Sequence, residues 1–202
     1  MAPRRRRQGR KFLDSDLLAK ASKVVSEFAK EDGIEIALLG GAAMQFYGSP
    51  RLTGDIDFVA AAPLAEREEL RGTGVLSIGG KKYVTIGEVP VDLIVREDEY
   101  TSLYEEALDE ADETDEGFLV VTPEHLAAIK FSTQRSKDDL DLMWLLAQKG
   151  LVDIKRVEDI VKRHMGGRFA VNEFRQVANE VRWRSRSGEF DDKEDPQRGE
   201  EE

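Results

Sequence analysis

Two aspartates separated by one residue are the most informative chemical feature of this sequence. Asp55 and Asp57 lie in the segment 55–60, whose apolar residues follow the pattern of a strand. Side chains two apart on a strand point to the same face, so the two carboxylates are expected to stand side by side. Neighbouring negative charges are costly unless a cation lies between them, and a divalent ion suits carboxylate oxygens. The pair therefore predicts a metal site.

A third carboxylate interrupts a later apolar segment. Asp92 is the only charged residue in 89–95, which is otherwise typical of a buried strand. Because an unpaired buried aspartate is costly, we expect a partner for it. If this strand lies beside 55–60, Asp92 completes a cluster with Asp55 and Asp57. Such a cluster can hold one or two Mg²⁺ ions, with phosphate oxygens filling the remaining positions.

A pair of glycines lies where a short apolar strand, 34–39, turns into a helix, 42–47. Gly40 and Gly41 lack a Cβ atom, so the backbone can approach a ligand closely. The unpaired amides at a helix start favour phosphate. Together with the carboxylates, this turn predicts in-line phosphoryl or nucleotidyl transfer.

The elements that must position these residues are strands mixed with helices up to residue 121. Periodicity and turn residues predict helices at 13–30, 42–47, 63–71 and 98–111, and strands at 34–39, 55–60, 75–78, 82–86, 89–95 and 118–121. Only helices follow, at 122–135, 137–148, 153–164 and 170–183. The pattern predicts an α/β (α+β) fold, with a mixed sheet and a helical C-terminal half.

Composition divides the 202 residues further and excludes several classes of protein. We expect a disordered basic arm at 1–11, a sheet domain at 12–121, a helical region at 122–184 and a disordered tail at 185–202. The arm is either a solvated tail or a phosphate-binding segment. The absence of cysteine excludes disulfide scaffolds and thiol catalysis. A net charge of −11 is not typical of a dedicated nucleic-acid binder. The lack of cysteine and of a membrane-length apolar run favours a cytoplasmic protein with no membrane partner.

These residues occur in an order that resembles a known superfamily. The pattern of Gly40-Gly41, Arg51-x-Thr53-x-Asp55-x-Asp57 and Asp92 resembles the polymerase-beta type nucleotidyltransferases, and in particular the AbiEii-type abortive-infection toxins. A second motif of that group, a helix with Lys, then Arg, then Asp-x-x-Asp, matches 130–141. The resemblance covers about residues 34–146.

The resemblance assigns a role to each matching residue. It implies a mixed-sheet nucleotidyltransferase core that uses Mg²⁺ and an NTP. Metal ligation falls on Asp55 and Asp57, and Asp92 is the third carboxylate, a base or metal ligand for the attacking hydroxyl. The resemblance further assigns the phosphate-binding turn to Gly40 and Gly41, flanking positions to Arg51 and Thr53, phosphate contact to Lys130, and to Asp138 a partnership with Lys130 or Arg135.

The function implied is magnesium-dependent transfer of a nucleoside monophosphate from an NTP to a hydroxyl. By resemblance the acceptor is a tRNA end or a protein, and the resemblance also implies a toxin with a cognate antitoxin. One alternative is an antibiotic-modifying nucleotidyltransferase, although the basic stretch 163–186 suits a sugar acceptor poorly. The other alternative is a nucleotide-binding module without catalysis.

Overall fold

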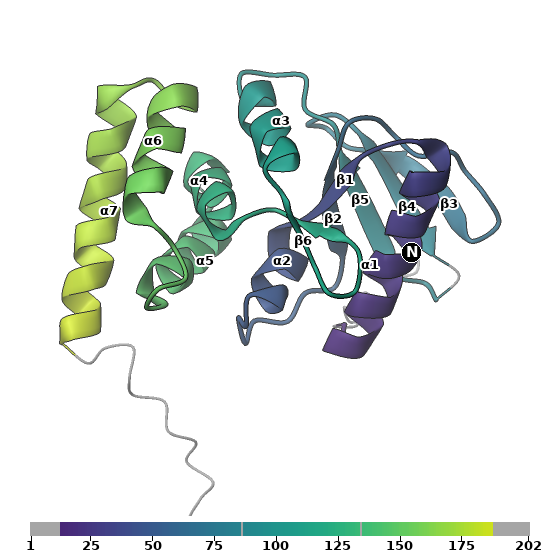
Figure 1. Cartoon of the computed structure of the whole chain (residues 1–202), viewed down its shortest axis with the longest axis horizontal. Helices are drawn as coiled ribbons and strands as arrows, with labels where there is room; N and C mark the ends of the chain where they lie inside the picture. The colour runs from purple at the N-terminus through teal and green to yellow at the C-terminus, as the bar shows by residue number, and fades with distance from the viewer. Residues whose placement is uncertain (1–12, 86, 134, 188–202) are drawn as a thin grey trace, which may run out of the picture. The chain divides into compact units, whose positions relative to one another are not determined.

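The fold is seen in a computed structural model that describes residues 13–85, 87–133 and 135–187 (Figure 1). The basic arm at 1–11 and the segment 188–202 lie outside these residues. Contacts between Cα atoms divide the chain after Val121 into two compact units. Within the described part, the first unit contains a seven-stranded mixed sheet with three helices, and the second contains four helices. The α/β class, with a mixed sheet and a helical C-terminal half, is therefore confirmed.

The first unit is built around one sheet. Its helices are α1 (Ser15–Asp32), α2 (Gly40–Phe46) and α3 (Thr101–Asp109). Its strands are β1 (Ile36–Leu39), β2 (Ile56–Ala60), β3 (Leu70–Val75), β4 (Lys81–Thr85), β5 (Pro90–Ile94), β6 (Asp112–Glu113) and β7 (Leu119–Val120). The order across the sheet is β3-β4-β5-β2-β1-β7-β6. The pairs β2–β5 and β1–β7 are parallel, and the other pairs are antiparallel.

The centre of this sheet is apolar. All four residues of β1 are buried, and Phe58 of β2 and Leu93 of β5 are fully buried. Helix α1 begins at Ser15, two residues after the predicted start, and the Asp14 side chain caps it by accepting a hydrogen bond from the Leu17 amide at 2.7 Å. It ends at Asp32, two residues after the predicted end, and Gly33, with a φ of 68°, caps it in the left-handed conformation.

Two of the expected elements in this unit are wrong. Residues 63–71 do not form a helix. Instead, Arg67 and Leu70 exchange backbone hydrogen bonds of 3.1 Å in a tight turn, and β3 begins at Leu70. The guanidinium of Arg67 is held by Asp32 at 2.5 Å and Glu31 at 2.7 Å, so contacts distant in sequence override the local helix preference. The strand expected at 75–78 is consequently found earlier, at Leu70–Val75. The two-residue strand β6 was not expected.

The second unit is entirely helical in its described part. Its helices are α4 (Pro123–Thr133), α5 (Ser136–Ala147), α6 (Ile154–His164) and α7 (Arg168–Arg186). Leu126, Leu145, Ile160 and Phe174 are fully buried, one from each helix in turn. Helix α7 continues through Ser185 and Arg186, so the first residues of the segment expected to be disordered, 185–202, are helical. No helix among the described residues combines the length and the apolar character that crossing a membrane requires.

Candidate active site

Parallel pairing of β2 and β5 makes Asp57 and Asp92 neighbours. The two Cα atoms are register partners, and both side chains are half-buried. Register partners on adjacent strands project from the same face of a sheet, and adjacent strands lie about 4.8 Å apart. The sequence analysis expected Asp92 to join the cluster if its strand lay beside 55–60, and the structure shows that it does.

Gly40 lies directly against the carboxylate of Asp57. A Cβ atom built on Gly40 would lie 2.0 Å from Oδ2 of Asp57, far inside van der Waals contact. Gly40 also has a φ of 63°, in the left-handed region that side chains disfavour. Both observations require glycine here. The turn between β1 and α2 therefore packs directly against the Asp57 carboxylate, which only a residue without a side chain allows.

A second set of contacts lies beside the contact of Gly40 with Asp57. It involves Gly41, Arg51, Thr53 and Asp55. The Thr53 hydroxyl donates to Oδ1 of Asp55 at 2.9 Å and to the Asp55 carbonyl at 3.2 Å. A Cβ atom on Gly41 would lie 2.7 Å from the Thr53 hydroxyl and 3.2 Å from a guanidinium nitrogen of Arg51. Asp55 itself lies one residue before β2. The structure thus brings Arg51 and Thr53 to the glycine turn.

Lys82 is a residue of this site that the sequence did not single out. Its Nζ lies 3.2 Å from Oδ2 of Asp92, and the two residues are register partners in the antiparallel pair β4–β5. The Lys82 side chain is 46% exposed and that of Asp92 is 19% exposed. The cation therefore stands at the solvent side of the carboxylate. A hairpin centred on Gly87 would have predicted this register, since 82 and 92 are equally distant from it.

The donor set fits a divalent cation of the magnesium type. Asp55, Asp57 and Asp92 offer carboxylate oxygens, the ligands that Mg²⁺ prefers. The site contains no thiolate, because the sequence has no cysteine. Because Gly40 has no Cβ, the Asp57 carboxylate lies next to the β1–α2 turn. The backbone amides of such a turn can bind a phosphate. These residues could thus hold a metal ion together with an anionic ligand.

The second motif forms a buried ionic network in the helical unit. Lys130 of α4 is 4% exposed, and its Nζ lies 2.7 Å from Oδ1 of Asp138 and 2.7 Å from Oδ2 of Asp141. Asp138 and Asp141 are three residues apart on α5, so both face α4. The partnership of Asp138 with Lys130 that the motif implied is observed, and Arg135 also donates to Asp138 at 2.6 Å. The phosphate contact assigned to Lys130 stays a prediction.

The charge state of Asp138 follows from this network. Burial by itself would raise the pKa of the Asp138 carboxyl, because it penalises the charged form. The hydrogen bond and charge of Lys130, the Thr133 hydroxyl at 2.8 Å and the charge of Arg135 outweigh burial and hold this pKa below its ordinary value. The network is therefore an ion pair rather than a neutral one.

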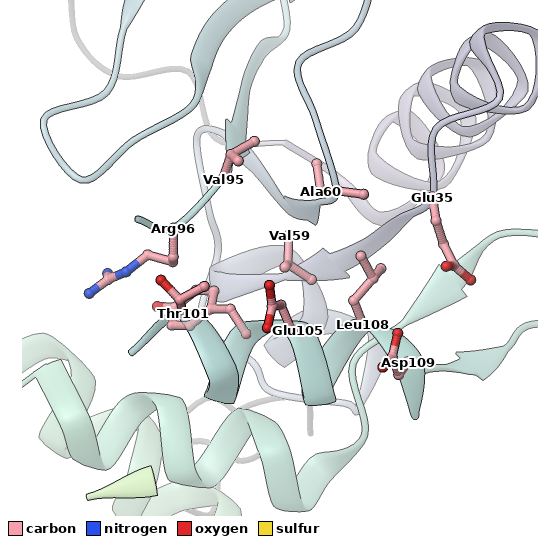
Figure 2. A pocket seen from close by; sticks show the side chains of 11 residues that line it. Glu35, Val59, Ala60, Val95, Arg96, Thr101, Glu105, Leu108 and Asp109 are labelled. Carbon is pink, nitrogen blue, oxygen red and sulfur yellow. The ribbon is translucent and has the colours of Figure 1, made fainter. Parts of the chain in front are cut away.

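A cavity of about 200 Å³ lies elsewhere in the sheet unit, between α3 and the ends of β2 and β5 (Figure 2). Val59 and Ala60, at the end of β2, and Leu108 of α3 contribute apolar side chains to it, and Glu105 of α3 lines it too. Its basic lining residue is Arg96. Because Asp98 already binds the Arg96 guanidinium at 2.5 and 2.9 Å, the cavity suits phosphate poorly. None of Asp55, Asp57 and Asp92 lines it.

Comparisons with known proteins give two similar solved structures. No family model matches the sequence, and no curated protein matches it. An antigenic nucleotidyltransferase-like protein from Paracoccidioides brasiliensis is 19% identical, with a TM-score of 0.47 over 80% of this chain and 95% of that chain. The antibiotic-resistance factor ANT(2'')-Ia is 17% identical, with a TM-score of 0.37 over 89% of this chain and 99% of that chain. At these values neither likeness bears on function, which rests on the geometry above.

Proposed function

We propose that the protein is a nucleotidyltransferase of the polymerase-beta type. It transfers a nucleoside monophosphate from an NTP to a hydroxyl group and releases pyrophosphate, as the bond between the α- and β-phosphates is replaced by one to the hydroxyl oxygen. The observation that carries this proposal is the register of Asp57 with Asp92, with Gly40 packed against the Asp57 carboxylate. That juxtaposition joins three segments, the β1–α2 turn, β2 and β5, at one place. A merely structural aspartate pair would not explain why a glycine is needed beside it.

Each part of the site has a task in the proposed transfer. The carboxylates of Asp55, Asp57 and Asp92 would hold Mg²⁺, which when bound aligns the reacting phosphate and neutralises the leaving group. The Gly40 and Gly41 amides would bind phosphate oxygens of the NTP. The acceptor hydroxyl would approach beside Asp92.

The supporting residues keep this geometry in place. The Thr53 hydroxyl fixes one oxygen of Asp55, which leaves the other available. Arg51, beside Gly41, is a further phosphate-binding candidate. Lys82 balances the charge of Asp92. The Lys130 ammonium is buried in ion pairs with Asp138 and Asp141. It would contact the phosphates only if these ion pairs opened, or if the ammonium bonded to a phosphate and an aspartate at once.

The finer assignments belong to the same proposal. The order of motifs favours the AbiEii-type toxins over other branches, and with them a tRNA or protein acceptor and a cognate antitoxin. The order of Lys130, Arg135, Asp138 and Asp141, with the pairing seen between them, supports this choice. The composition of the sequence favours a cytoplasmic location.

Transfer of label from α-labelled NTP in the presence of Mg²⁺ tests the proposal. Asp57→Asn and Asp92→Asn each remove a ligand charge while keeping the shape of the side chain, so we expect transfer to fall at least about a hundredfold. Asp115→Asn, an exposed carboxylate of the same unit, is the matched control and should retain full transfer. Undiminished transfer by Asp57→Asn or Asp92→Asn would refute the assignment.

A second measurement separates catalysis from binding alone. If the chain were a nucleotide-binding module, Mg²⁺ and NTP would raise its melting temperature without turnover. At a hundredfold excess of ligand over its dissociation constant, the stabilisation would be about 2.7 kcal/mol. Stabilisation together with label transfer is the result we expect.

A further inference from the structure

One face of α7 presents exposed side chains in ordered rows. With 3.6 residues per turn, positions seven apart nearly superimpose along the axis of a helix. One row consists of Phe169, Gln176 and Trp183, and the adjacent row consists of Arg168, Arg175 and Arg182. All six side chains are exposed. We call this surface the α7 face.

The aromatic residues of the α7 face are exceptionally open to solvent. Phe169 is 72% exposed and Trp183 is 67% exposed. They are fourteen positions apart, which is about 21 Å along the helix axis. The exposed residues between them include no aliphatic side chain: the amide Gln176 lies in the aromatic row, Asn172 and Asn179 lie on its arginine side, and Glu173 and Glu180 border its other side. The face therefore offers flat stacking surfaces separated by hydrogen-bonding groups.

The arginine row leaves its positive charge facing solvent. Arg175 lies 2.5 Å from Glu158 and is still 54% exposed. Arg168 and Arg182 form no ion pair with other described residues, and the same holds for Arg186 in the last turn. This concentration of arginine is unusual in a protein whose net charge is −11.

The glutamates of α7 lie on the other side of the helix from this row. Counted at 100° per residue, Glu173 and Glu180 fall beyond the aromatic row, away from the arginines. Glu180 is moreover paired with Arg184 at 2.5 Å. The α7 face thus combines positive charge, amides and two open rings, with its acidic residues kept to one edge.

We propose that the α7 face binds single-stranded nucleic acid. Unpaired bases stack on exposed aromatic side chains, and arginines neutralise the phosphates between them. The amides can bond to base edges that are exposed in an unpaired strand. A distance of about 21 Å corresponds to about six stacked nucleotides at 3.4 Å each. A protein partner would instead require an apolar centre, which the amides between the two rings do not provide.

This surface gives the proposed transfer a class of acceptor. If the proposed function holds, the hydroxyl that receives the nucleoside monophosphate belongs to a polynucleotide. Binding at the α7 face does not itself depend on catalysis, so the two statements can fail separately.

Fluorescence anisotropy with the full-length protein tests the binding. The probes are a labelled single-stranded RNA of about ten nucleotides, the DNA of the same sequence and the duplex of each. We expect both single strands to bind, and the duplexes to bind at least about tenfold more weakly because their bases are already stacked. The comparison of RNA with DNA shows which sugar is preferred.

Two sets of substitutions separate stacking from charge. Phe169→Ala with Trp183→Ala should raise the dissociation constant about tenfold or more, since each stacked base contributes strongly. Arg168→Gln, Arg182→Gln and Arg186→Gln together should reduce the slope of log K against log salt by about 2, at about 0.7 per phosphate.

Leu140, a similarly exposed apolar residue of α5 at 62% exposure, supplies the matched control: Leu140→Ala should bind as the unmodified chain does. Unchanged affinity in the aromatic double variant, or equal binding of duplex and single strand, would overturn the proposal.

A chain shortened at its C-terminus tests whether the protein's own residues 188–202, rather than a nucleic acid, occupy the α7 face. Residues 188–202 are acidic and follow α7 directly, so they could cover the same face. If an oligonucleotide bound only to a chain ending at Ser187, the acidic segment would be the occupant in the full protein and the proposal would be wrong. We expect binding by both forms.

The Asp57→Asn variant separates this proposal from the proposed function. It should bind the oligonucleotide normally while failing to extend it. Normal binding with full transfer would refute the catalytic role of Asp57 and leave the α7 face standing. If the unmodified protein transferred the nucleotide but bound no oligonucleotide at the α7 face, the proposal for the α7 face would be refuted and the proposed function would stand.

Discussion

Asp57 and Asp92 are register partners across the parallel strands β2 and β5, and Lys82 is the register partner of Asp92 on its other side. The three side chains therefore form one row across the sheet. In this row the Lys82 ammonium, 3.2 Å from Asp92, stands where a positive charge is needed. A divalent cation between the aspartates would supply the same charge more strongly. A divalent cation bound there, as we propose, would therefore compete with Lys82 for Asp92.

Replacing Lys82 should strengthen the response to metal. Because its ion pair with Asp92 is partly exposed, Lys82→Gln should lower the free energy of unfolding by less than about 1 kcal/mol. The rise in melting temperature on adding Mg²⁺ should be larger than in the unmodified protein, since the competing cation is gone. Differential scanning fluorimetry with and without Mg²⁺ measures both effects. Lys20→Gln, an exposed lysine of α1, is the control, and equal metal shifts in both variants would contradict the competition.

Gly40→Ala should disable the site through Asp57 and not through backbone strain alone. The new Cβ would displace the Asp57 carboxylate, whose Oδ2 lies 2.0 Å from its position. Gly33→Ala is a close control, because Gly33 has a φ of 68° against 63° for Gly40, but nothing lies within 4 Å of its Cβ position. Both variants should lose about 1–2 kcal/mol from left-handed strain.

Only Gly40→Ala should also lose label transfer from NTP. Urea unfolding gives the first quantity and the transfer assay the second. Comparable transfer by the two alanine variants would mean that the close approach of Gly40 to Asp57 has no functional consequence.

The sequence singles out the carboxylates of the candidate site because their signals are local, and the structure places Asp57 and Asp92 side by side. Their role as metal ligands stays a prediction. Asp92 stands out as a lone charge in an apolar run, and Asp55 and Asp57 follow the two-residue period of a strand. The element at 63–71 could not be predicted in the same way. The contacts that fix Arg67 come from Asp32 and Glu31, more than thirty positions earlier in the chain. Local propensity carries no information about such partners.

The burial of Lys130 and the ion pair of Lys82 both depend on how helices and strands pair in the fold, so local sequence does not reveal them. Lys130 is a basic residue in the last turn of α4, and nothing in its neighbourhood along the chain indicates a buried side chain. Its burial depends on α4 and α5 lying side by side, which places Asp138 and Asp141 over it. The partnership of Lys82 with Asp92 likewise depends on the register of a hairpin.

Thr53 positions Asp55, and its hydroxyl should matter more than its shape. Thr53→Val keeps the volume of the buried side chain but removes the donor that lies 2.9 Å from Oδ1 of Asp55. A hydrogen bond to a charged group contributes about 1.5–3 kcal/mol, so transfer should fall about tenfold or more. Thr53→Ser keeps the hydroxyl and should retain most of the activity. Equal loss in the valine and serine variants would show that packing of the methyl group, not the hydrogen bond, is responsible.

Removing the charge of Asp138 should destabilise the helical unit strongly. Asp138→Asn leaves the buried Lys130 with Asp141 as its remaining charged partner, and breaking a buried pair costs about 3–5 kcal/mol. Asp139→Asn changes the adjacent, exposed aspartate and should have an effect below about 0.5 kcal/mol. Urea unfolding at neutral pH distinguishes them. Similar losses in the two variants would contradict the ion pair as the source of stability.

The stabilisation from Asp138 should also depend on pH in one direction. Because the pKa of Asp138 is lowered in the folded protein, the folded state keeps its carboxylate charged at a pH where the unfolded chain takes up a proton. The contribution is fully present above the ordinary aspartate pKa near 4 and is lost as pH falls through the lower, folded value. The difference in unfolding free energy between the unmodified protein and Asp138→Asn should therefore shrink when the urea titration is repeated below about pH 4. A difference that stays constant from neutral to acid pH would mean that Asp138 contributes through its hydrogen bonds alone and not through its charge.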